Sequence, residues 1–267
     1  MFDWLITIPV PFESFSLGAI IVVALAHGFG CFVRGAFGFG SNLPIVLVTT
    51  FILGPHHAII LSLMTSLVSQ AHLLPQGFRT GDWQIAKQLV LGLIIGTVFG
   101  VWLFSILSAE KLALILGIII SVIILMDTFK LVEYFANFIE FRLRWVTVGF
   151  SFIGGMIGGL SGAGAFYFLV VFLKHACQGA IKLRGTTLML STIAMIMRFA
   201  ALSFSGFISL TVILEGLFLA PVVVLATWLG SQTFRKSSSK NFYQALQVLL
   251  FAGGTILVYK GIQDWNN

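Results

Sequence analysis

Charged side chains are scarce in this sequence of 267 residues. Lys and Arg number 15 and Asp and Glu number 9, so 9% of the chain is charged, whereas an ordinary soluble domain carries roughly 25%. Hydrophobic residues make up 58% of the chain, and 27 residues are Phe. So few charges could not cover a soluble fold of this size, because most of the Phe side chains would face water. The composition therefore argues against a water-soluble enzyme and predicts a chain solvated by lipid.

Cysteine is also scarce, since Cys31 and Cys177 are the only two and no Cys-x-x-Cys or Cys/His ligand spacing surrounds them. The sequence contains no nucleophile elbow, P-loop or His-Glu-x-x-His pattern. It also lacks the basic stripe with interleaved aromatics that would favour nucleic acid. We therefore expect no catalytic activity, no bound cofactor, no metal site and no nucleic-acid partner.

Ten apolar stretches run along the chain between charges, Pro or Gly. Six are near the length of about 20 residues that a helix needs to cross a bilayer. We predict an all-α polytopic membrane protein whose single transmembrane domain covers residues 1–267. The stretches are 15–33, 42–54, 58–74, 89–107, 112–127, 146–160, 165–173, 184–204, 210–229 and 245–259.

Four of these stretches form two close pairs, and each pair has a member too short to cross the membrane. The connections within the pairs, 35–42 and 158–164, are rich in glycine and lack Lys, Asp and Glu. We interpret both pairs as broken-helix hairpins whose tips lie inside the protein at membrane depth, where non-helical backbone needs protein or a polar cavity around it. The pairs are 15–33 with 42–54 and 146–160 with 165–173.

The two hairpins match each other in pattern, as is typical of the repeats of transporters. A shift of 124 residues places the glycines of the first connection on those of the second, and a shift of 130 aligns Gly96-x-x-x-Gly100 with Ala226-x-x-x-Gly230. We predict two repeats, each a broken-helix hairpin followed by three transmembrane helices. Repeat one covers about 15–127, a cytoplasmic linker covers 128–145, and repeat two covers about 146–262.

Lys and Arg of short loops are retained on the cytoplasmic side, which fixes an orientation. One arrangement places eleven basic residues inside and two outside, Lys111 and Lys260, and no other assignment of these segments does as well. Hairpin one then enters from the outside and hairpin two from the inside, so the repeats have inverted topology. In this arrangement the C-terminus is periplasmic, and loops 75–88, 128–145, 174–184 and 231–241 are cytoplasmic.

The hairpin tips carry the residues best suited to bind an anion. In the first tip, Ser41 or Asn42 is a good N-cap and Pro44 suits a first helical turn, so a helix would begin there with its N–H groups and positive dipole end toward the glycines. The alternative is that the glycines only allow close helix packing. We assign packing to Gly92, Gly96, Gly100, Gly154 and Gly158. The predicted tip ligands are Gly38, Gly40, Ser41, Asn42, Ser161, Gly162 and Gly164.

Two arginines fall within apolar regions, Arg34 beside the first tip and Arg198 within 184–204. An intramembrane Arg is unfavourable unless it faces a cavity or a partner, and its paired donors suit multi-oxygen anions. We predict that both bind the substrate. The alternatives are that Arg198 snorkels or pairs with Glu215, and that Arg34 binds a loop carbonyl.

Glu215 is the only acidic residue clearly inside an apolar stretch, and it is either a proton-coupling carboxyl or the partner of an Arg. His27 lies deep in the first stretch and either relays a proton or forms a hydrogen bond within the packed core. We interpret His56, His57 and His72 as interfacial. Hydroxyl groups that suit an oxyanion, or that bond to their own helix backbone, belong to Thr65, Ser66, Thr186 and Thr187.

The chain resembles the sulfite exporter TauE/SafE family, also called the toluene sulfonate uptake permease family. The resemblance rests on the segment 35–44, on the Gly96-to-Gly100 helix with 108–112, and on the repeated glycines of 158–164. It implies a multipass transporter of the bacterial inner membrane for sulfite, sulfoacetate or related sulfur anions, without a bound cofactor. Phe37 and Phe39 stand where members often have glycine, and an aromatic wall suits an anion with an organic tail.

The leading hypothesis is therefore a secondary transporter, and the resemblance to the family favours export. Its partners are a small sulfonate or sulfur oxyanion and the lipid bilayer, and a homodimer is left open. An anion channel of the same substrate class is the alternative. A membrane enzyme or scaffold is disfavoured, because the sequence shows neither a nucleophile or metal constellation nor a large soluble surface.

Overall fold

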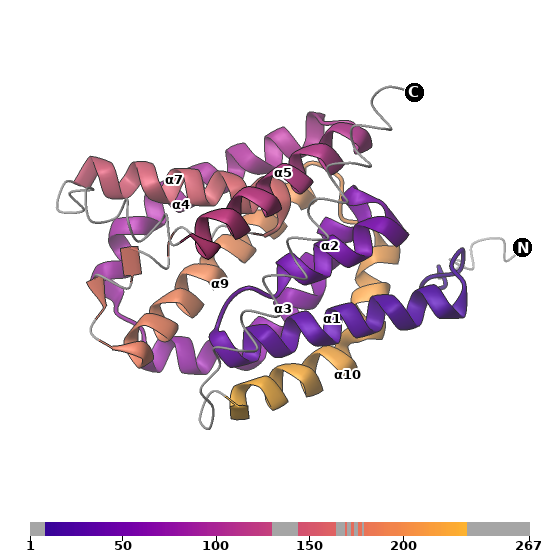
Figure 1. The fold of residues 1–267 in the computed structure, drawn as a ribbon, viewed down its shortest axis with the longest axis horizontal. Coiled ribbons are helices and arrows are strands. Elements are labelled where there is room, and N and C mark those ends of the chain that lie inside the picture. The colour runs from indigo at the N-terminus through magenta and orange to yellow at the C-terminus, as the bar shows by residue number, and fades with distance from the viewer. Residues whose placement is uncertain are drawn as a thin grey trace, which may run out of the picture.

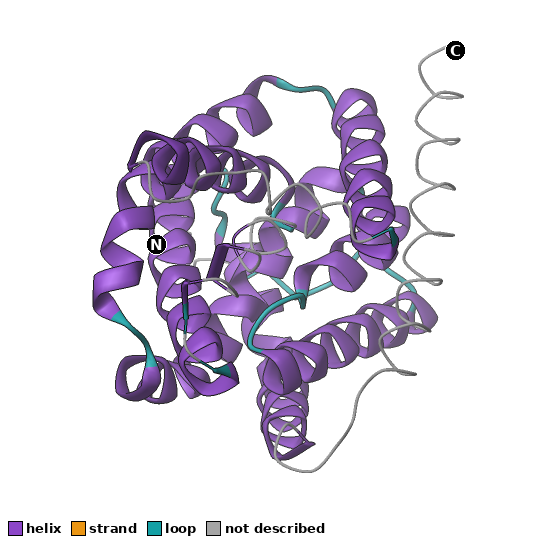
Figure 2. Cartoon of the chain, turned by 60° about the vertical axis from the view of Figure 1, so that its left-hand side comes forward, coloured by secondary structure: helices purple, strands orange, loops and turns teal. Residues whose placement is uncertain are grey.

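The computed structural model of the chain describes residues 9–129, 144–163 and 179–233, together with residues 169, 172, 173, 176 and 177. Helix is the only regular secondary structure in these residues (Figure 1, Figure 2). Five of the described helices, α1, α3, α4, α9 and α10, are long and apolar enough to cross a membrane. The helices are α1 (Leu17–Phe37), α2 (Asn42–Leu53), α3 (Pro55–Thr80), α4 (Trp83–Ile106), α5 (Ala109–Thr128), α7 (Arg144–Ser161), α9 (Ala180–Phe204) and α10 (Leu210–Thr233).

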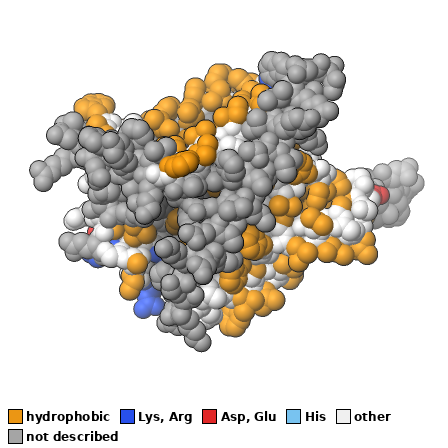
Figure 3. Space-filling view, viewed as in Figure 1, with side chains coloured by type: hydrophobic (Ala, Val, Ile, Leu, Met, Phe, Trp, Pro, Cys, Tyr) orange, Lys and Arg blue, Asp and Glu red, His pale blue; other side chains and the backbone are white. Residues whose placement is uncertain are grey.

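The outer surface of the described helices is strongly apolar (Figure 3). Helix α1 exposes Leu17, Ile21 and Leu25 at a spacing of four residues, and α4 exposes Leu91 and Ile95 in the same way. Rows of large apolar side chains on one face of a helix would be unfavourable in water and are favourable in hydrocarbon. The surface therefore supports the prediction of a lipid-solvated chain.

Local signals in the sequence set the helix ends. Ser16 caps α1 by accepting a hydrogen bond from the N–H of Ala19, at 3.3 Å. Asp82 caps α4 by accepting from the N–H groups of Gln84 and Ile85. Such side-chain acceptors satisfy N–H groups that have no partner within the helix, so they favour a helix start at that residue.

The first predicted hairpin is present. Helix α1 ends at Phe37, Gly38 adopts a positive φ of 85°, and α2 begins at Asn42. Helix α2 has 12 residues, which span about 18 Å at 1.5 Å per residue and cannot cross a hydrocarbon core of about 30 Å. Helix α7 ends in the same way, because Gly162 has a φ of 70° directly after it.

Several predicted segments lie wholly or largely outside the described residues. They are most of the short stretch 165–173, most of the linker 128–145, most of the loop 231–241, and the last apolar stretch 245–259.

The helices pack in pairs that cross between the two halves of the chain. Helix α1 lies along α10, α7 lies along α4, and α3 packs against α9 near the centre of the molecule (Figure 1). Helix α3 is the most buried of the five span-length helices. The residues near the breaks of α1 and α7 are therefore surrounded by protein on several sides.

Glycine brings α4 and α7 into backbone contact, as predicted for Gly92, Gly96 and Gly100. A Cβ atom on each of these would meet backbone or side-chain atoms of α7. On α7 the glycines that touch α4 are Gly155 and Gly159, each one residue beyond a predicted packing position. Consecutive residues of a helix point about 100° apart, so a shift of one residue changes the face that meets the neighbouring helix.

Candidate functional site

Arg34 lies in the last turn of α1, just before the first break, and is 3% exposed. Its Nη1 donates to Ser41 Oγ at 3.1 Å, and its Nη2 lies 3.6 Å from the Met195 sulfur of α9. The Nε atom has no hydrogen-bond partner among the described residues. A thioether sulfur is a weak acceptor, so this guanidinium keeps donor capacity that a stronger acceptor could use.

Ser41 occupies the predicted cap position of α2, but it does not cap the helix. Its backbone is already helical, with φ −58° and ψ −41°, and its side chain makes no capping hydrogen bond. The hydroxyl instead accepts from Arg34 and donates to Asn42 Oδ1 at 2.7 Å. Of the two predicted caps, Ser41 stands at the N-cap position but makes no side-chain cap, because the charged donor next to its hydroxyl takes the place of the helix N–H groups.

Asn42 connects the two breaks. Its Oδ1 accepts hydrogen bonds from Ser41 Oγ and from Ser66 Oγ of α3, the latter at 2.6 Å. Its Nδ2 donates to the carbonyl oxygen of Gly162 at 2.5 Å. One side chain thus joins the first break, the central helix and the second break.

The second break places Gly162 against Arg198 of α9. A Cβ atom at Gly162 would lie 2.8 Å from both Nη1 and Nη2, so only glycine allows the guanidinium this close. Arg198 is 5% exposed, and its Nε and Nη2 have no hydrogen-bond partner in the part of the chain that the structure describes. The predicted alternative, a pair with Glu215, is wrong, since that carboxylate is bonded to His57 instead.

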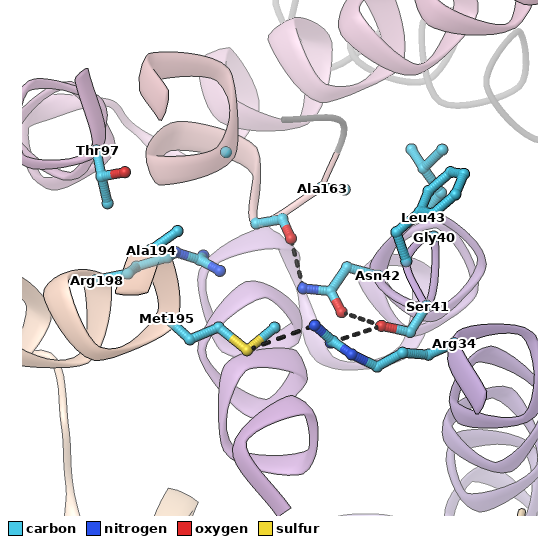
Figure 4. A pocket seen from close by; sticks show the side chains of 13 residues that line it. Arg34, Gly40, Ser41, Asn42, Leu43, Thr97, Ala163, Ala194, Met195 and Arg198 are labelled. Carbon is cyan, nitrogen blue, oxygen red and sulfur yellow. Dashed lines mark hydrogen bonds between the residues drawn. The ribbon is translucent and has the colours of Figure 1, made fainter. Parts of the chain in front are cut away.

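A cavity of about 60 Å³ lies between the two breaks (Figure 4). Arg34, Asn42 and Arg198 point toward it from three different elements, and none of its described lining residues is acidic. By this measure the cavity has room for a few water molecules or a compact anion. Its lining residues are Arg34, Phe39, Gly40, Ser41, Asn42, Leu43, Thr97, Gly158, Gly162, Ala163, Ala194, Met195 and Arg198.

Not every predicted tip residue lines the cavity. Gly38 gives its N–H to the carbonyl oxygen of Arg34 at 2.7 Å and faces the side chain of Arg184. The Ser161 hydroxyl lies 2.6 Å from the carbonyl oxygen of Ile157 and so is turned to its own backbone. Gly164 lies outside the described residues.

Arg184, which belongs to the predicted cytoplasmic loop 174–184, is a buried arginine. Helix α9 begins at Ala180, so Arg184 lies in its second turn, and it is 3% exposed. Its Nη2 donates to the carbonyl oxygen of Gly35 at 2.6 Å, near the end of α1. The residue therefore supports the first break from outside the cavity, and no local sequence signal separates it from Lys182, two residues before it.

The two predicted proton-coupling residues lie away from the cavity lining. His27 is completely buried, and its Nδ1 lies 2.8 Å from Thr65 Oγ1. Glu215 is 2% exposed, and its Oε2 lies 2.5 Å from Nε2 of His57, which is 26% exposed. His57 therefore has a specific buried partner that its position at the end of an apolar stretch did not reveal.

The four hydroxyl groups predicted to suit an oxyanion have different partners. Ser66 bonds to Asn42 and so belongs to the surroundings of the cavity, whereas Thr65 contacts His27. Thr186 and Thr187 donate to backbone carbonyls of their own helix, at 2.8 and 2.9 Å, which was the alternative left open for them. In the described ranges no cluster of three His, Cys, Asp or Glu could hold a metal ion.

The apolar surface and the span-length helices define a polytopic membrane protein with a cationic cavity between two helix breaks. Residues 21–257 match the model of the sulfite exporter TauE/SafE family. This match covers most of the chain, so the protein belongs to that family, as its motifs had indicated. No curated protein and no solved structure matches the chain significantly.

Proposed function

We propose that this protein is a secondary transporter that moves a small sulfur-containing anion, such as sulfite or an organosulfonate like sulfoacetate, across the bacterial inner membrane. Membership of the sulfite exporter family supports this substrate class and favours export. The single observation that carries the proposal is the cavity between the breaks, which holds two buried guanidinium groups and no described carboxylate.

The charge of the cavity favours an anionic guest. A buried guanidinium is strongly unfavourable without a counter-charge or enough hydrogen bonds. Arg198 has unpartnered Nε and Nη2 atoms among the described residues, and Arg34 has an unpartnered Nε and a weak contact to sulfur. An oxyanion between them would accept from several of these donors at once, and it would supply the missing negative charge.

The backbone at the breaks adds to this anion site. Gly40 and Gly162 both line the cavity with positive φ, so peptide groups rather than side chains border it there. Helix α2 begins at the cavity without a side-chain cap, and its positive dipole end is therefore directed at the guest. Phe39 and Leu43 form an apolar part of the wall against which an organic tail would pack.

Matching contacts in the two halves support the proposed repeats. A Cβ atom at Gly230 would meet the Phe32 carbonyl of α1, and one at Gly100 would meet the Met156 carbonyl of α7. Met156 follows Phe32 by 124 residues and Gly230 follows Gly100 by 130, which are the two shifts that align the repeats. The pairing of α1 with α10 thus repeats that of α7 with α4, as a two-fold relation between halves requires.

The proposed transport step is a movement of one half against the other around the cavity. The charge distribution of the loops supports inverted topology, with loops 75–88, 128–145, 174–184 and 231–241 in the cytoplasm and a periplasmic C-terminus. The two breaks then approach the cavity from opposite faces of the membrane. The Asn42 bond across the breaks favours a carrier over an open pore, because it ties together the two parts that a pore would keep apart.

The test is counterflow of labelled sulfite into proteoliposomes loaded with unlabelled sulfite. The wild type should accumulate label transiently, whereas R34Q and R198Q should each lose roughly tenfold or more of the initial rate, because a hydrogen bond to a charged group contributes about 1.5–3 kcal/mol. R79Q removes the same charge from an exposed position of α3 and serves as the matched control. Conductance without counterflow would identify a channel, and unchanged rates in R34Q and R198Q would place the substrate elsewhere.

A further inference from the structure

A second buried polar site lies away from the anion cavity, where α3 and α10 begin. Glu215 is the sixth residue of α10, and its carboxylate is bonded to His57, the third residue of α3, at 2.5 Å. Glu215 is the only acidic residue in the five span-length helices. In the predicted topology this end of the two helices faces the periplasm.

The surroundings of the pair are apolar and aromatic. The ring of Phe15 lies edge-on to that of His57, with 6.4 Å between the centroids. Phe218, one turn after Glu215, packs against the buried Phe12. A carboxylate buried in such a place is unfavourable unless it is protonated or paired, and the imidazole of His57 is its partner here.

The pair reaches the surface of the molecule through His57. Glu215 is 2% exposed, but the side chain of His57 is 26% exposed and connects the carboxylate to the surface. With one proton between Nε2 and Oε2 the pair has no net charge, and without that proton its net charge is −1. A change of this size in an apolar site alters the attraction between α3 and α10 strongly.

Resting on the transport function proposed above, we propose that His57 and Glu215 form a proton-binding site and that one proton taken up there is coupled to each anion moved. Helix α3 carries His57 and also Ser66, which donates to Asn42 at the cavity. Helix α10 carries Glu215 and packs along α1, the helix of Arg34. Any movement of α10 against α3 on loss of the proton therefore reaches both sides of the anion site.

No other titratable side chain of the described residues is recorded as bonded to either partner. Helices α1 and α3 pack against α10, and among their titratable side chains His57 is the one bonded to Glu215. His56, the neighbour of His57, stacks on Phe207 and contacts Phe104 instead. The other titratable groups of these helices are His27, Cys31 and Arg34 on α1 and His72 and Arg79 on α3, and Glu13, Glu110 and Lys111 lie just before α1 and at the start of α5.

The experiment compares anion accumulation with and without a pH difference across proteoliposomes, with the membrane potential clamped by potassium and valinomycin and labelled sulfite as the probe. E215Q keeps the shape of the side chain but cannot take up a proton, and H57Q removes the imidazole. H72Q, at an exposed histidine of the same helix, is the control. Sulfite itself changes protonation near neutral pH, but it does so equally for every variant.

If one proton is coupled to each anion, the ratio of sulfite inside to outside should change about tenfold for each pH unit of difference in the wild type and H72Q. This change comes in addition to the response that E215Q shows. E215Q and H57Q should retain sulfite counterflow at equal pH, which also shows that they fold. If E215Q does not fold, the response of H57Q to the pH difference is compared with that of the wild type instead.

Equal responses to the pH difference in the wild type, E215Q and H57Q would overturn the inference and leave the pair a structural contact. The absence of sulfite counterflow in the wild type would overturn the proposed function itself, and this inference with it.

Discussion

The amide of Asn42 donates to the carbonyl oxygen of Gly162 at 2.5 Å, across 120 residues of sequence. This bond joins the start of α2 to the end of α7, and the anion cavity lies beside it. Two chain breaks that are each rich in glycine are thereby held at a fixed distance. The bond restricts the backbone of both breaks, since glycine backbone without such a tie has many conformations available.

The first prediction concerns this bond. N42D keeps the size of the side chain and its acceptors for Ser41 and Ser66, but it replaces the donor that faces Gly162 with a carboxylate oxygen. The new negative charge also neutralises Arg34 and repels an anion. We expect sulfite counterflow to fall by more than about tenfold.

S66A is the control for N42D, since it removes one hydrogen bond to Asn42 Oδ1 without adding charge. It should keep most of the counterflow. An N42D protein that transports sulfite as fast as the wild type would show that neither the bond nor the charge of the cavity matters for transport.

The second prediction separates backbone strain from contact with Arg198. G162A should disturb the site, because the new methyl group would lie 2.8 Å from the guanidinium and the residue has a positive φ. G206A is the matched control, because Gly206 has a φ of 74° but open space around it. Each substitution carries roughly 1–2 kcal/mol of backbone strain, and only G162A should weaken sulfite binding.

Isothermal titration of the purified variants with sulfite measures this difference directly. Equal loss of affinity in G162A and G206A would mean that general destabilisation, rather than displacement of Arg198, explains the effect.

The third prediction tests the matching helix contacts. G100A and G230A each place a methyl group against a carbonyl oxygen of the partner helix, in α7 and α1 respectively. Overpacking of this kind typically lowers stability by about 1–3 kcal/mol. We expect both variants to melt below the wild type by a similar amount in detergent.

G18A is the control, because nothing lies within 4 Å of a Cβ atom at that position. A large loss of stability in only one of G100A and G230A would argue against equivalent roles for the two glycines.

The sequence predicted the helices and the first break well, because the signals for them are local. Glycine with positive φ, followed by Ser, Asn and Pro, ends one helix and starts another regardless of the rest of the fold. The role of Ser41 was missed, since it depends on Arg34, which lies within reach only once the break has formed.

Partners far apart in sequence could not be predicted in the same way. His57 and Glu215 are 158 residues apart, and nothing in the pattern around His57 separates it from His56. Arg184 could not be predicted either, because two basic residues close together, as with Lys182, are typical of a loop. It is buried by the packing of α9 on the end of α1, which the pattern does not show. These contacts follow from helix packing, which the hydropathy pattern does not specify.

The most direct test of the central claim is the effect of sulfite on the melting temperature of the purified protein and of its arginine variants. A ligand at a hundred times its Kd stabilises the folded state by about 2.7 kcal/mol, which is a shift of several degrees for a chain of this size. The wild type and R79Q should show this shift, and R34Q and R198Q should lose it while still unfolding cooperatively. A full shift in R34Q and R198Q would contradict an anion site between the two breaks.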